Sequence, residues 1–362
     1  MEKKRIFFRV DSSSILGFGH LNRCLILAKE LNNKNFEIHF ICKNLQGNLI
    51  KEIENQSFFI HRIDNFKNTI ENDFQFTKKI LKKFHGDISC IIIDNYRWNK
   101  KYELQLRSIV KCIFVIDDLA NRKHECDILL DQNLYSNFEK RYDKLVPKNC
   151  LCLLGPNYVL LRDEFLRSKK KRKITQLKKI FVSFGGQDCS NQSIKVLNGI
   201  LHSGLEFNEI NVVIGKSNKF LKRLKNISKQ IKNVKIFVGT NNISSLMQMS
   251  DLGIGASGSM MWERAYLGIP GLVSIIGKNQ ELSAKTMEKI CCVKNLGLAK
   301  KVSYEDYRKF FLGIKIEKLN KMSKNNTRFF DGKGKQRIVT KLIQKIKEQE
   351  SKESLEFQKH ID

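Results

Sequence analysis

The chain has 362 residues, of which 41% are hydrophobic, and carries a formal net charge of +29. That length suits two compact domains with well-formed cores, and no apolar run approaches the length of a membrane-spanning helix. The lysines are spread along the chain, often among asparagines, and no zinc pattern or RNA-binding motif accompanies them. We therefore expect no nucleic-acid partner, although a basic background would still attract an anionic ligand.

The ten cysteines do not have the spacing of a disulfide framework, since Cys291 and Cys292 are adjacent and no C-x-x-C occurs. Four of them lie within apolar runs and are expected to be reduced core residues: Cys24, Cys42, Cys90 and Cys112. The N-terminus passes directly into a predicted strand without an apolar signal region. These features predict a cytoplasmic protein without membrane insertion.

Short β-branched runs alternate with helical patterns through the first half of the chain. The predicted strands are Arg5–Val10, Glu37–Cys42, Phe58–Ile63, Ile88–Asp94, Cys112–Ile116 and Ile128–Leu130. Several are apolar throughout, which is typical of parallel strands covered on both faces. The pattern predicts a doubly wound, Rossmann-like α/β domain over residues 1–168.

The first predicted strand is joined to a helix by a turn rich in serine and glycine. Gly17 and Gly19 permit a tight turn and a close backbone approach to a ligand, and N–H groups at a helix start favour an anion. His20 lies in the first helical turn, where the helix dipole disfavours its charged form. This placement suits a general base, although a surface histidine after any first Rossmann turn gives the same pattern. Asp11 either orients the imidazole or accepts N–H groups of the turn.

A basic run at residues 169–178 has no apolar period and is predicted to be a solvated linker. A second series of strands follows at Lys179–Phe184, Glu209–Ile214, Val234–Val238, Leu252–Gly255 and Gly271–Ile276. It predicts a second Rossmann-like domain over residues 179–331. Residues 332–350 have the apolar spacing of a helix, and the charged tail at 351–362 is expected to be disordered.

Two strand-to-helix turns of the second predicted domain carry ligand-binding signals. Gly185 and Gly186 expose backbone N–H groups suited to a diphosphate, although a Gly-Gly turn alone is weak evidence. Ser257 and Ser259 cap the helix after the second turn, contact phosphate, or do both. Glu263 lies near the start of that helix, where a carboxylate is often only a partner of the helix dipole.

The opening pattern from Arg9 to Arg23 resembles that of the nucleotide-sugar hydrolases of pseudaminic acid biosynthesis, the PseG type, which resemble the MurG-like glycosyltransferases in fold. Further segments follow in the order of that family: Ile92–Tyr96, Ile116–Asp118, Cys126–Asn133, Leu160–Phe165, Phe184–Asp188 and Lys278–Glu281. No single segment is decisive, but the ordered set is specific. The resemblance implies a GT-B fold, with two Rossmann-like domains facing a cleft, which strand alternation alone does not select.

The resemblance also implies an activity: hydrolysis of UDP-2,4-diacetamido-2,4,6-trideoxy-β-L-altrose to UDP and the free sugar, with inversion. His20 would be the general base for the attacking water. The implied substrate-binding residues are Asp11, Gly17, Gly19, Arg23, Tyr96, Arg162, Gly185, Gly186, Ser257, Ser259, Glu263, Asn279 and Gln280. Gly185 and Gly186 would hold the diphosphate, Glu263 the ribose, and Asn279 and Gln280 the sugar. We expect a monomer that needs no cofactor and no metal, with the UDP-sugar and water as its partners.

The sequence leaves alternative functions open. A glycosyltransferase of the same fold would pass the sugar to an acceptor hydroxyl, and a base and a UDP site serve both reactions. A noncatalytic protein that binds a nucleotide sugar or nucleic acid is the alternative from another class. Arg9, Arg23 and Arg162 are cationic candidates for the sugar diphosphate, although Arg162 is equally placed to pair with Asp163 or Glu164. Tyr96 is either a site residue or a surface loop residue.

Overall fold

The structure is a computed structural model that describes residues 3–13, 15–64, 67, 69–167 and 173–358, with side chains described as far as residue 352. The chain divides into two compact units. The first contains the N-terminal segment up to residue 133, residues 137–160 and the C-terminal segment from residue 333; the second contains residues 134–136 and 161–332.

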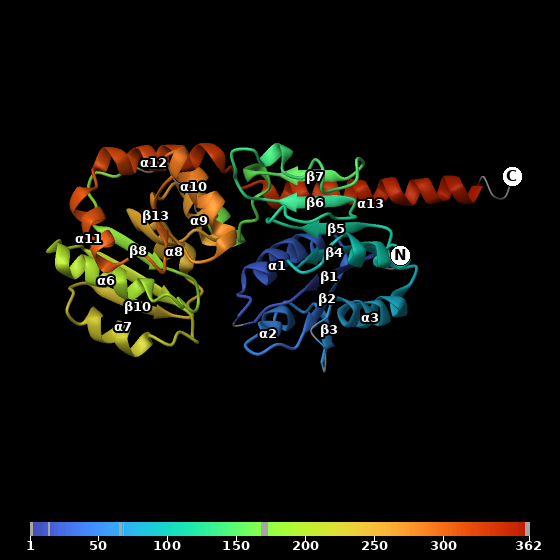
Figure 1. The fold of residues 1–362 in the computed structure, drawn as a ribbon, viewed down its shortest axis with the longest axis horizontal. Coiled ribbons are helices and arrows are strands. Elements are labelled where there is room, and N and C mark those ends of the chain that lie inside the picture. Colours follow the sequence, from blue (N-terminus) through green and yellow to red (C-terminus); the bar gives the residue numbers. More distant parts are fainter. Residues whose placement is uncertain (1–2, 14, 65–66, 68, 168–172, 359–362) are drawn as a thin grey trace. The chain divides into compact units, whose positions relative to one another are not determined.

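The first unit is built on a seven-stranded sheet in which every pair of neighbours is parallel (Figure 1). Its strands are β1 (Arg5–Val10), β2 (Glu37–Lys43), β3 (Phe59–Ile63), β4 (Ile88–Asp94), β5 (Ile113–Ile116), β6 (Ile128–Asp131) and β7 (Leu151–Leu154), in the order β3-β2-β1-β4-β5-β6-β7. The six strands predicted here are confirmed. The sequence analysis missed β7, which is a short edge strand of four residues.

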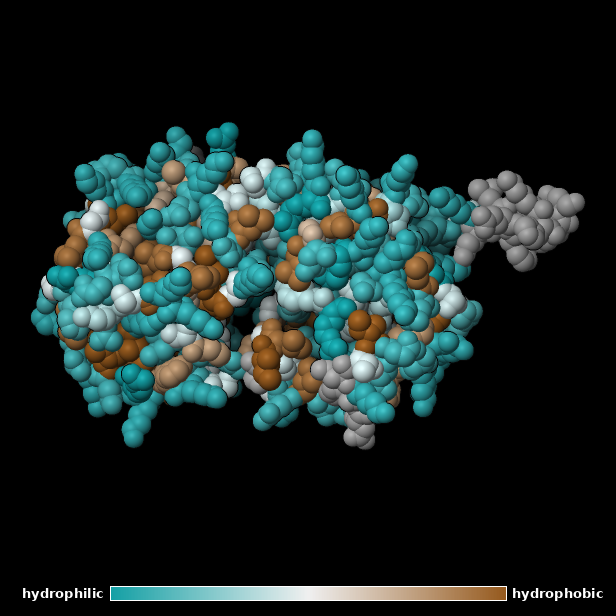
Figure 2. Space-filling model, viewed as in Figure 1, coloured by the Kyte–Doolittle hydropathy of each residue, from teal (hydrophilic) through white to brown (hydrophobic). Residues whose placement is uncertain are grey.

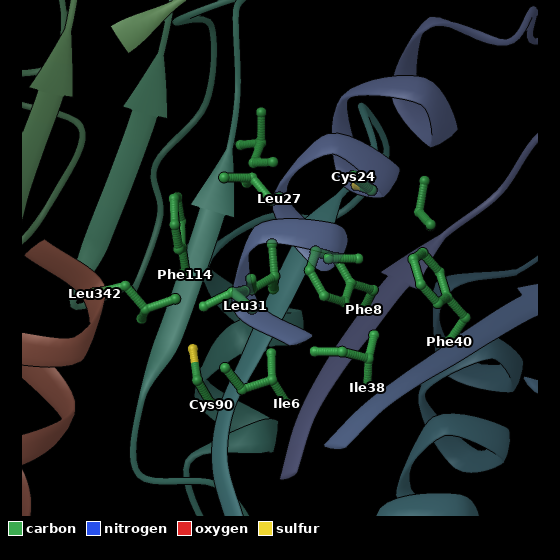
Figure 3. Packing of buried hydrophobic residues seen from close by; sticks show 14 of the residues in the cluster. Ile6, Phe8, Cys24, Leu27, Leu31, Ile38, Phe40, Cys90, Phe114 and Leu342 are labelled. Carbon is green, nitrogen blue, oxygen red and sulfur yellow. The ribbon is translucent and has the colours of Figure 1, made fainter. Parts of the chain in front are cut away.

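Helices cover both faces of this sheet. They are α1 (Gly19–Asn32), α2 (Ile50–Glu54), α3 (Ile70–Leu81), α4 (Lys100–Leu106) and α13 (Gly334–Gln358), with 3-10 turns at Lys82–Phe84, Phe138–Lys140 and Pro156–Tyr158. Successive residues of β1 point to opposite faces, so Phe8 packs with α1 and α13 whereas Phe7 packs with α3 and α4. Figure 3 shows the core between β1 and α1, with Leu342 of α13 beside Phe114. Because both faces are covered, the strands are apolar throughout.

The C-terminal helix α13 packs on the first unit, against α1. Ile338, Leu342 and Ile346 are buried in its core, and Lys335 forms an ion pair of 3.0 Å with Glu30. The helix continues to Gln358, into the segment that was expected to be a disordered tail, because lysine, glutamate and glutamine are good helix formers. The predicted domain boundary also differs: the structure divides the chain after residue 160, not after 168.

The second unit has a six-stranded parallel sheet. Its strands are β8 (Lys179–Ser183), β9 (Glu209–Ile214), β10 (Val234–Val238), β11 (Leu252–Ala256), β12 (Gly271–Ile275) and β13 (Val293–Leu298), in the order β10-β9-β8-β11-β12-β13. Its helices are α5 (Asp163–Leu166), α6 (Gln192–Ser203), α7 (Leu221–Ser228), α8 (Ile243–Gln248), α9 (Ser259–Tyr266), α10 (Glu281–Lys289), α11 (Tyr304–Gly313) and α12 (Ile316–Phe329), with a 3-10 turn at Lys278–Gln280. The five strands predicted here are confirmed, and β13 was missed. Most of the expected basic linker, residues 168–172, lies outside the described residues.

Surface and core composition agree with the sequence-based expectations. The four cysteines expected in the core are buried, and no disulfide joins any of the cysteines described. Hydrophilic residues cover most of the face shown in Figure 2, with apolar residues between them. No helix in the described part of the chain combines the length and apolarity that a membrane crossing requires.

Candidate active site

The strand order of each sheet reverses at one point, between β1 and β4 in the first unit and between β8 and β11 in the second. In open α/β sheets, ligands bind outside the carboxyl ends of the strands at such a reversal, which we call the switch point of the unit. The first switch point gathers His20, Arg23, Asp94 and Tyr96, and the second gathers Ser257 and its neighbours.

At the first switch point, the His20 imidazole contacts the Asp94 carboxylate. Gly17 has a φ of 79°, in the left-handed region that favours glycine, and its N–H donates to the Ser13 carbonyl at 3.0 Å. Gly19 starts α1, so His20 lies in the first helical turn, with Nδ1 2.5 Å from Asp94 Oδ1. A carboxylate at Nδ1 keeps the proton on that nitrogen and leaves the lone pair on Nε2.

Arg23, almost one helical turn after His20, holds the same carboxylate. Its Nε donates to Asp94 Oδ2 and its Nη2 to Asp94 Oδ1, both at 2.6 Å, while Nη1 donates to Asp118 at 3.1 Å. Burial alone would raise the pKa of Asp94, but Arg23 and then His20 outweigh burial and keep that pKa well below its usual range. Asp94 is therefore ionised. Arg23, buried and paired, positions this carboxylate.

Tyr96 and Asp11 also lie at this switch point, with different roles. The Tyr96 ring meets the His20 ring edge-on, with centroids 4.5 Å apart, so the tyrosine is part of the group. Asp11 accepts hydrogen bonds from Arg9 at 2.6 Å and from the backbone N–H of Lys43 at 2.8 Å. Neither role expected for Asp11 is the one the structure has, since its N–H donors include Arg9 and Lys43 but no described residue of the turn, and Asp94 is the carboxylate that contacts the imidazole.

Arg9 is a buried structural residue. Its side chain has no exposed area, is paired with Asp11 and Asp73, and lies 4.5 Å from the centroid of the Trp98 ring. The expectation that Arg9 meets a ligand was therefore wrong. Its guanidinium instead neutralises two buried carboxylates.

Two further buried carboxylates follow β5 and end β6. The Tyr142 hydroxyl lies within hydrogen-bond distance of both carboxylates, 2.9 Å from Asp117 and 3.2 Å from Asp131. Asp131 also accepts a hydrogen bond from the backbone N–H of Asn133 at 3.1 Å. Burial, and then the negative charge of Asp118, raises the pKa of Asp131 to about 7. The fold therefore holds a proton on Asp131 in a pH range where an unfolded chain would not.

We expect Asp131→Asn to gain stability over the wild type as the pH rises from about 4 to about 7. A carboxyl whose pKa is raised in the folded state destabilises the fold across this window, because the folded protein gives up its proton less readily than the unfolded chain. The measurement is urea unfolding of both proteins from pH 4 to 8, with exposed Asp143→Asn as the control for loss of one negative charge. A difference that does not vary with pH would contradict the assignment.

At the second switch point, the turn after β8 contains Gly185 and Gly186. Gly185 has a φ of 85°, and the Gly186 carbonyl accepts the N–H of Gly215 at 2.9 Å. The following helix, α6, is already capped, since the Asp188 carboxylate accepts the N–H groups of Gln192 and Ser193, both at 2.8 Å. This carboxylate occupies the N–H groups that would otherwise attract an anion.

The turn after β11 leads into α9 without a side-chain cap. Gly258 is the N-cap residue, and no side chain among the described residues hydrogen-bonds to this helix start. Ser257 is buried and its hydroxyl donates to Gln280 Oε1 at 3.3 Å, whereas Ser259 and Asn279 are exposed. The structure thus brings together Ser257 and Gln280, from turns that are distant in the sequence.

Glu263 on α9 is held by Arg162. Arg162 donates to Glu263 Oε1 at 2.7 Å and to Oε2 at 2.9 Å, and also pairs with Glu164 at 2.8 Å. Burial raises the pKa of Glu263, although Arg162 opposes the rise. Each carboxylate oxygen can accept a second hydrogen bond, so the ion pair leaves acceptor capacity for a ligand.

Sequence reasoning missed the roles of three charged residues. Asp94 is the last residue of the otherwise apolar strand β4, and Asp131 is the last residue of β6. A single carboxylate at the end of a buried strand is therefore the sequence signal that could have identified both residues. Arg264 is almost completely buried, with 1% of its surface exposed, next to Glu263 on α9. The sequence signal for a buried side chain here is the pair of glycines in β11, Gly253 and Gly255.

Comparison with solved structures identifies the fold class. MurG of Acinetobacter baumannii superposes with a TM-score of 0.67 at 12% identity, over 94% of this chain and 99% of that one. UDP-GlcNAc 2-epimerase from Neisseria meningitidis gives a TM-score of 0.62 at 14% identity, over 94% of this chain and 100% of that one. The protein has the GT-B fold, as predicted.

Comparison of sequences identifies a relative. The chain is 29% identical over 287 residues to the UDP-2,4-diacetamido-2,4,6-trideoxy-beta-L-altropyranose hydrolase of Campylobacter jejuni, over 79% of this chain and 96% of that protein. The resemblance to the PseG type, inferred from the motifs, is confirmed. A family model described as a protein of unknown function, DUF354, matches residues 163–296.

Proposed function

We propose that the protein hydrolyses UDP-2,4-diacetamido-2,4,6-trideoxy-β-L-altrose to UDP and the free sugar. The observation that carries this proposal is the contact between His20 Nδ1 and the buried, ionised Asp94 at the switch point of the first unit. A histidine oriented in this way presents Nε2 as a general base. The similarity to a curated hydrolase of this substrate over 79% of the chain supports the choice of reaction.

In the proposed reaction, His20 Nε2 takes a proton from water as the water oxygen attacks the anomeric carbon. The C–O bond to UDP breaks, its electron pair leaves with the β-phosphate oxygen, and the proton later passes from His20 to solvent. A single displacement of this kind inverts the anomeric configuration. UDP leaves as an anion without protonation by a side chain, so backbone N–H groups around the diphosphate are the stabilisation that matters most.

UDP binds the second unit in this proposal. Glu263 accepts hydrogen bonds from the ribose hydroxyls while Arg162 holds its carboxylate, and Gly185, Gly186, Ser257 and Ser259 surround the diphosphate. Asn279 and Gln280 contact the sugar, as the resemblance implies. The support is the location of these residues beyond the carboxyl ends of β8, β11 and β12.

We expect Glu263→Ala to weaken UDP binding by roughly 1–3 kcal/mol, because the change removes charge-assisted hydrogen bonds to the ribose. Calorimetric titration with UDP measures the loss. Glu164→Ala is the matched control, since it removes the other carboxylate paired with Arg162 and leaves Glu263 in place. Unchanged UDP affinity in Glu263→Ala would refute the ribose assignment.

The proposed function is tested with the UDP-diacetamido sugar in ¹⁸O-labelled water, without an acceptor and with EDTA present. We expect free UDP and free sugar, with the label in the sugar before anomeric exchange. Label in UDP would indicate P–O cleavage instead. Loss of activity in EDTA that Mg²⁺ or Mn²⁺ restores would contradict a metal-independent reaction. Release of UDP only when an acceptor alcohol is added, with the sugar recovered as a glycoside of that alcohol, would identify a glycosyltransferase.

A further inference from the structure

We propose that Arg264 provides the buried counter-charge for a diphosphate bound at the N-terminus of α9, an inference that rests on the UDP site proposed above. Its Nη2 donates to the Ala256 carbonyl at 3.0 Å. Within the described part of the chain, Nε and Nη1 have no hydrogen-bond partner, although both atoms are buried. A buried charge with unsatisfied donors is costly and calls for a compensating ligand.

Two glycines of β11 make room for this side chain. A Cβ atom at Gly253 would lie 2.5 Å from Arg264 Cδ, and one at Gly255 would lie 2.5 Å from Nη1. Real Cβ atoms do not approach so closely, so a Cβ atom at Gly253 would displace the arginine, whereas at Gly255 the backbone carbonyl of Ser183 excludes a Cβ atom independently of the arginine. The side chain therefore runs along β11 toward the carboxyl end of the strand.

The guanidinium ends at the second switch point. The same Cβ position at Gly255 lies 2.1 Å from the carbonyl oxygen of Ser183, the last residue of β8. Nη1 thus lies where β8 and β11 end side by side, and Nη2 donates to Ala256, the last residue of β11. A ligand bound outside these strand ends would have the positive charge directly behind the turn.

Among the residues that the structure describes, no carboxylate forms an ion pair with Arg264. Glu263, the residue before Arg264, is engaged by Arg162 through both carboxylate oxygens, and no hydrogen bond joins Glu263 to Arg264. Burial lowers the pKa of Arg264 to about 10, and Glu263 offsets only part of that shift. The guanidinium stays protonated at neutral pH, so a buried positive charge remains that Glu263 offsets only in part.

The N-termini of α6 and α9, the two helices that start at this switch point, differ in a way that favours binding of the diphosphate at α9. The start of α6 is capped by the Asp188 carboxylate. The start of α9 has no side-chain cap and has the Arg264 guanidinium behind it. A diphosphate at α9 would meet both the helix dipole and the buried charge, so Arg264 acts as a positioning residue that favours the anion without having to touch it.

Titration of wild-type protein, Arg264→Met and Arg264→Lys with UDP, uridine and inorganic pyrophosphate tests this role. We expect Arg264→Met to bind UDP and pyrophosphate about 10- to 100-fold more weakly, with uridine binding unchanged, and Arg264→Lys to lose less. Arg308→Met on α11, away from the strand ends, is the matched control and should bind all three ligands as the wild type does. Equal weakening of UDP and uridine, or no weakening of either, would overturn the role of Arg264.

Two measurements separate this inference from the proposed function. Pyrophosphate binding that depends on Arg264 would support the anion site even if the protein had no hydrolase activity. If neither substitution yields folded protein, the wild type still decides: pyrophosphate should raise its Tm, and UDP should bind more tightly than uridine. A wild-type protein whose Tm does not respond to pyrophosphate, and that binds uridine as tightly as UDP, would contradict the inference.

Discussion

The His20→Asn variant is expected to lose about 10²–10⁴-fold of its turnover and to keep its affinity for UDP. Asparagine cannot accept the proton of the attacking water, but its amide N–H can still donate to Asp94, so the buried carboxylate keeps a partner. UDP affinity should persist because the residues proposed to bind UDP lie in the second unit. Steady-state kinetics with the UDP-diacetamido sugar and calorimetry with UDP provide the two measurements.

The matched control for His20 is His85→Asn. His85 is exposed in the first unit and has no place at the switch point, so its replacement should leave turnover unchanged. Near-normal hydrolysis by His20→Asn would rule out the general-base role. Loss of UDP affinity together with turnover would instead indicate that His20 binds the nucleotide.

The second large effect is expected from Asp94→Asn, which should lower turnover by about 10²–10⁴-fold with His20 still present. Without the carboxylate, Nδ1–H loses its acceptor and the imidazole is no longer held with the lone pair on Nε2. Arg23 loses its closest anion, so the free energy of unfolding should fall by about 3–5 kcal/mol. Kinetics well below the Tm of the variant separate the loss of catalysis from the loss of stability.

Two further measurements distinguish catalysis from stability in Asp94→Asn. Asp118→Asn removes the other carboxylate of Arg23 but keeps the contact between Asp94 and His20, so it should cost stability with a smaller loss of turnover. The stability cost of Asp94→Asn should also shrink as the pH falls below about 4. A depressed pKa stabilises the fold only where the unfolded carboxyl is ionised. If Asp118→Asn loses as much turnover as Asp94→Asn, the orientation of His20 by Asp94 is not the decisive feature.

The sequence alone determined which segments form the buried strands and where the glycine turn before His20 lies. Continuous apolar runs such as Ile88–Asp94 identify parallel strands covered on both faces, and Gly17 and Gly19 identify the turn before His20. These signals are local, because they depend on side-chain periodicity and on the backbone freedom of glycine. The edge strands β7 and β13 escaped detection, since one has only four residues and the other contains lysine, asparagine and glycine.

Only the tertiary structure decided which charged groups meet. Asp11 and Asp94 both lie at the ends of apolar strands, and their sequence patterns are equally suited to orient His20. The placement of β4 beside β1 brings Asp94, from 74 residues away, to the imidazole, while Asp11 pairs with Arg9. Likewise, α13 joins the first unit and Arg264 is buried along β11. Such contacts depend on strand order and on how helices cover the sheet, which local sequence patterns do not encode.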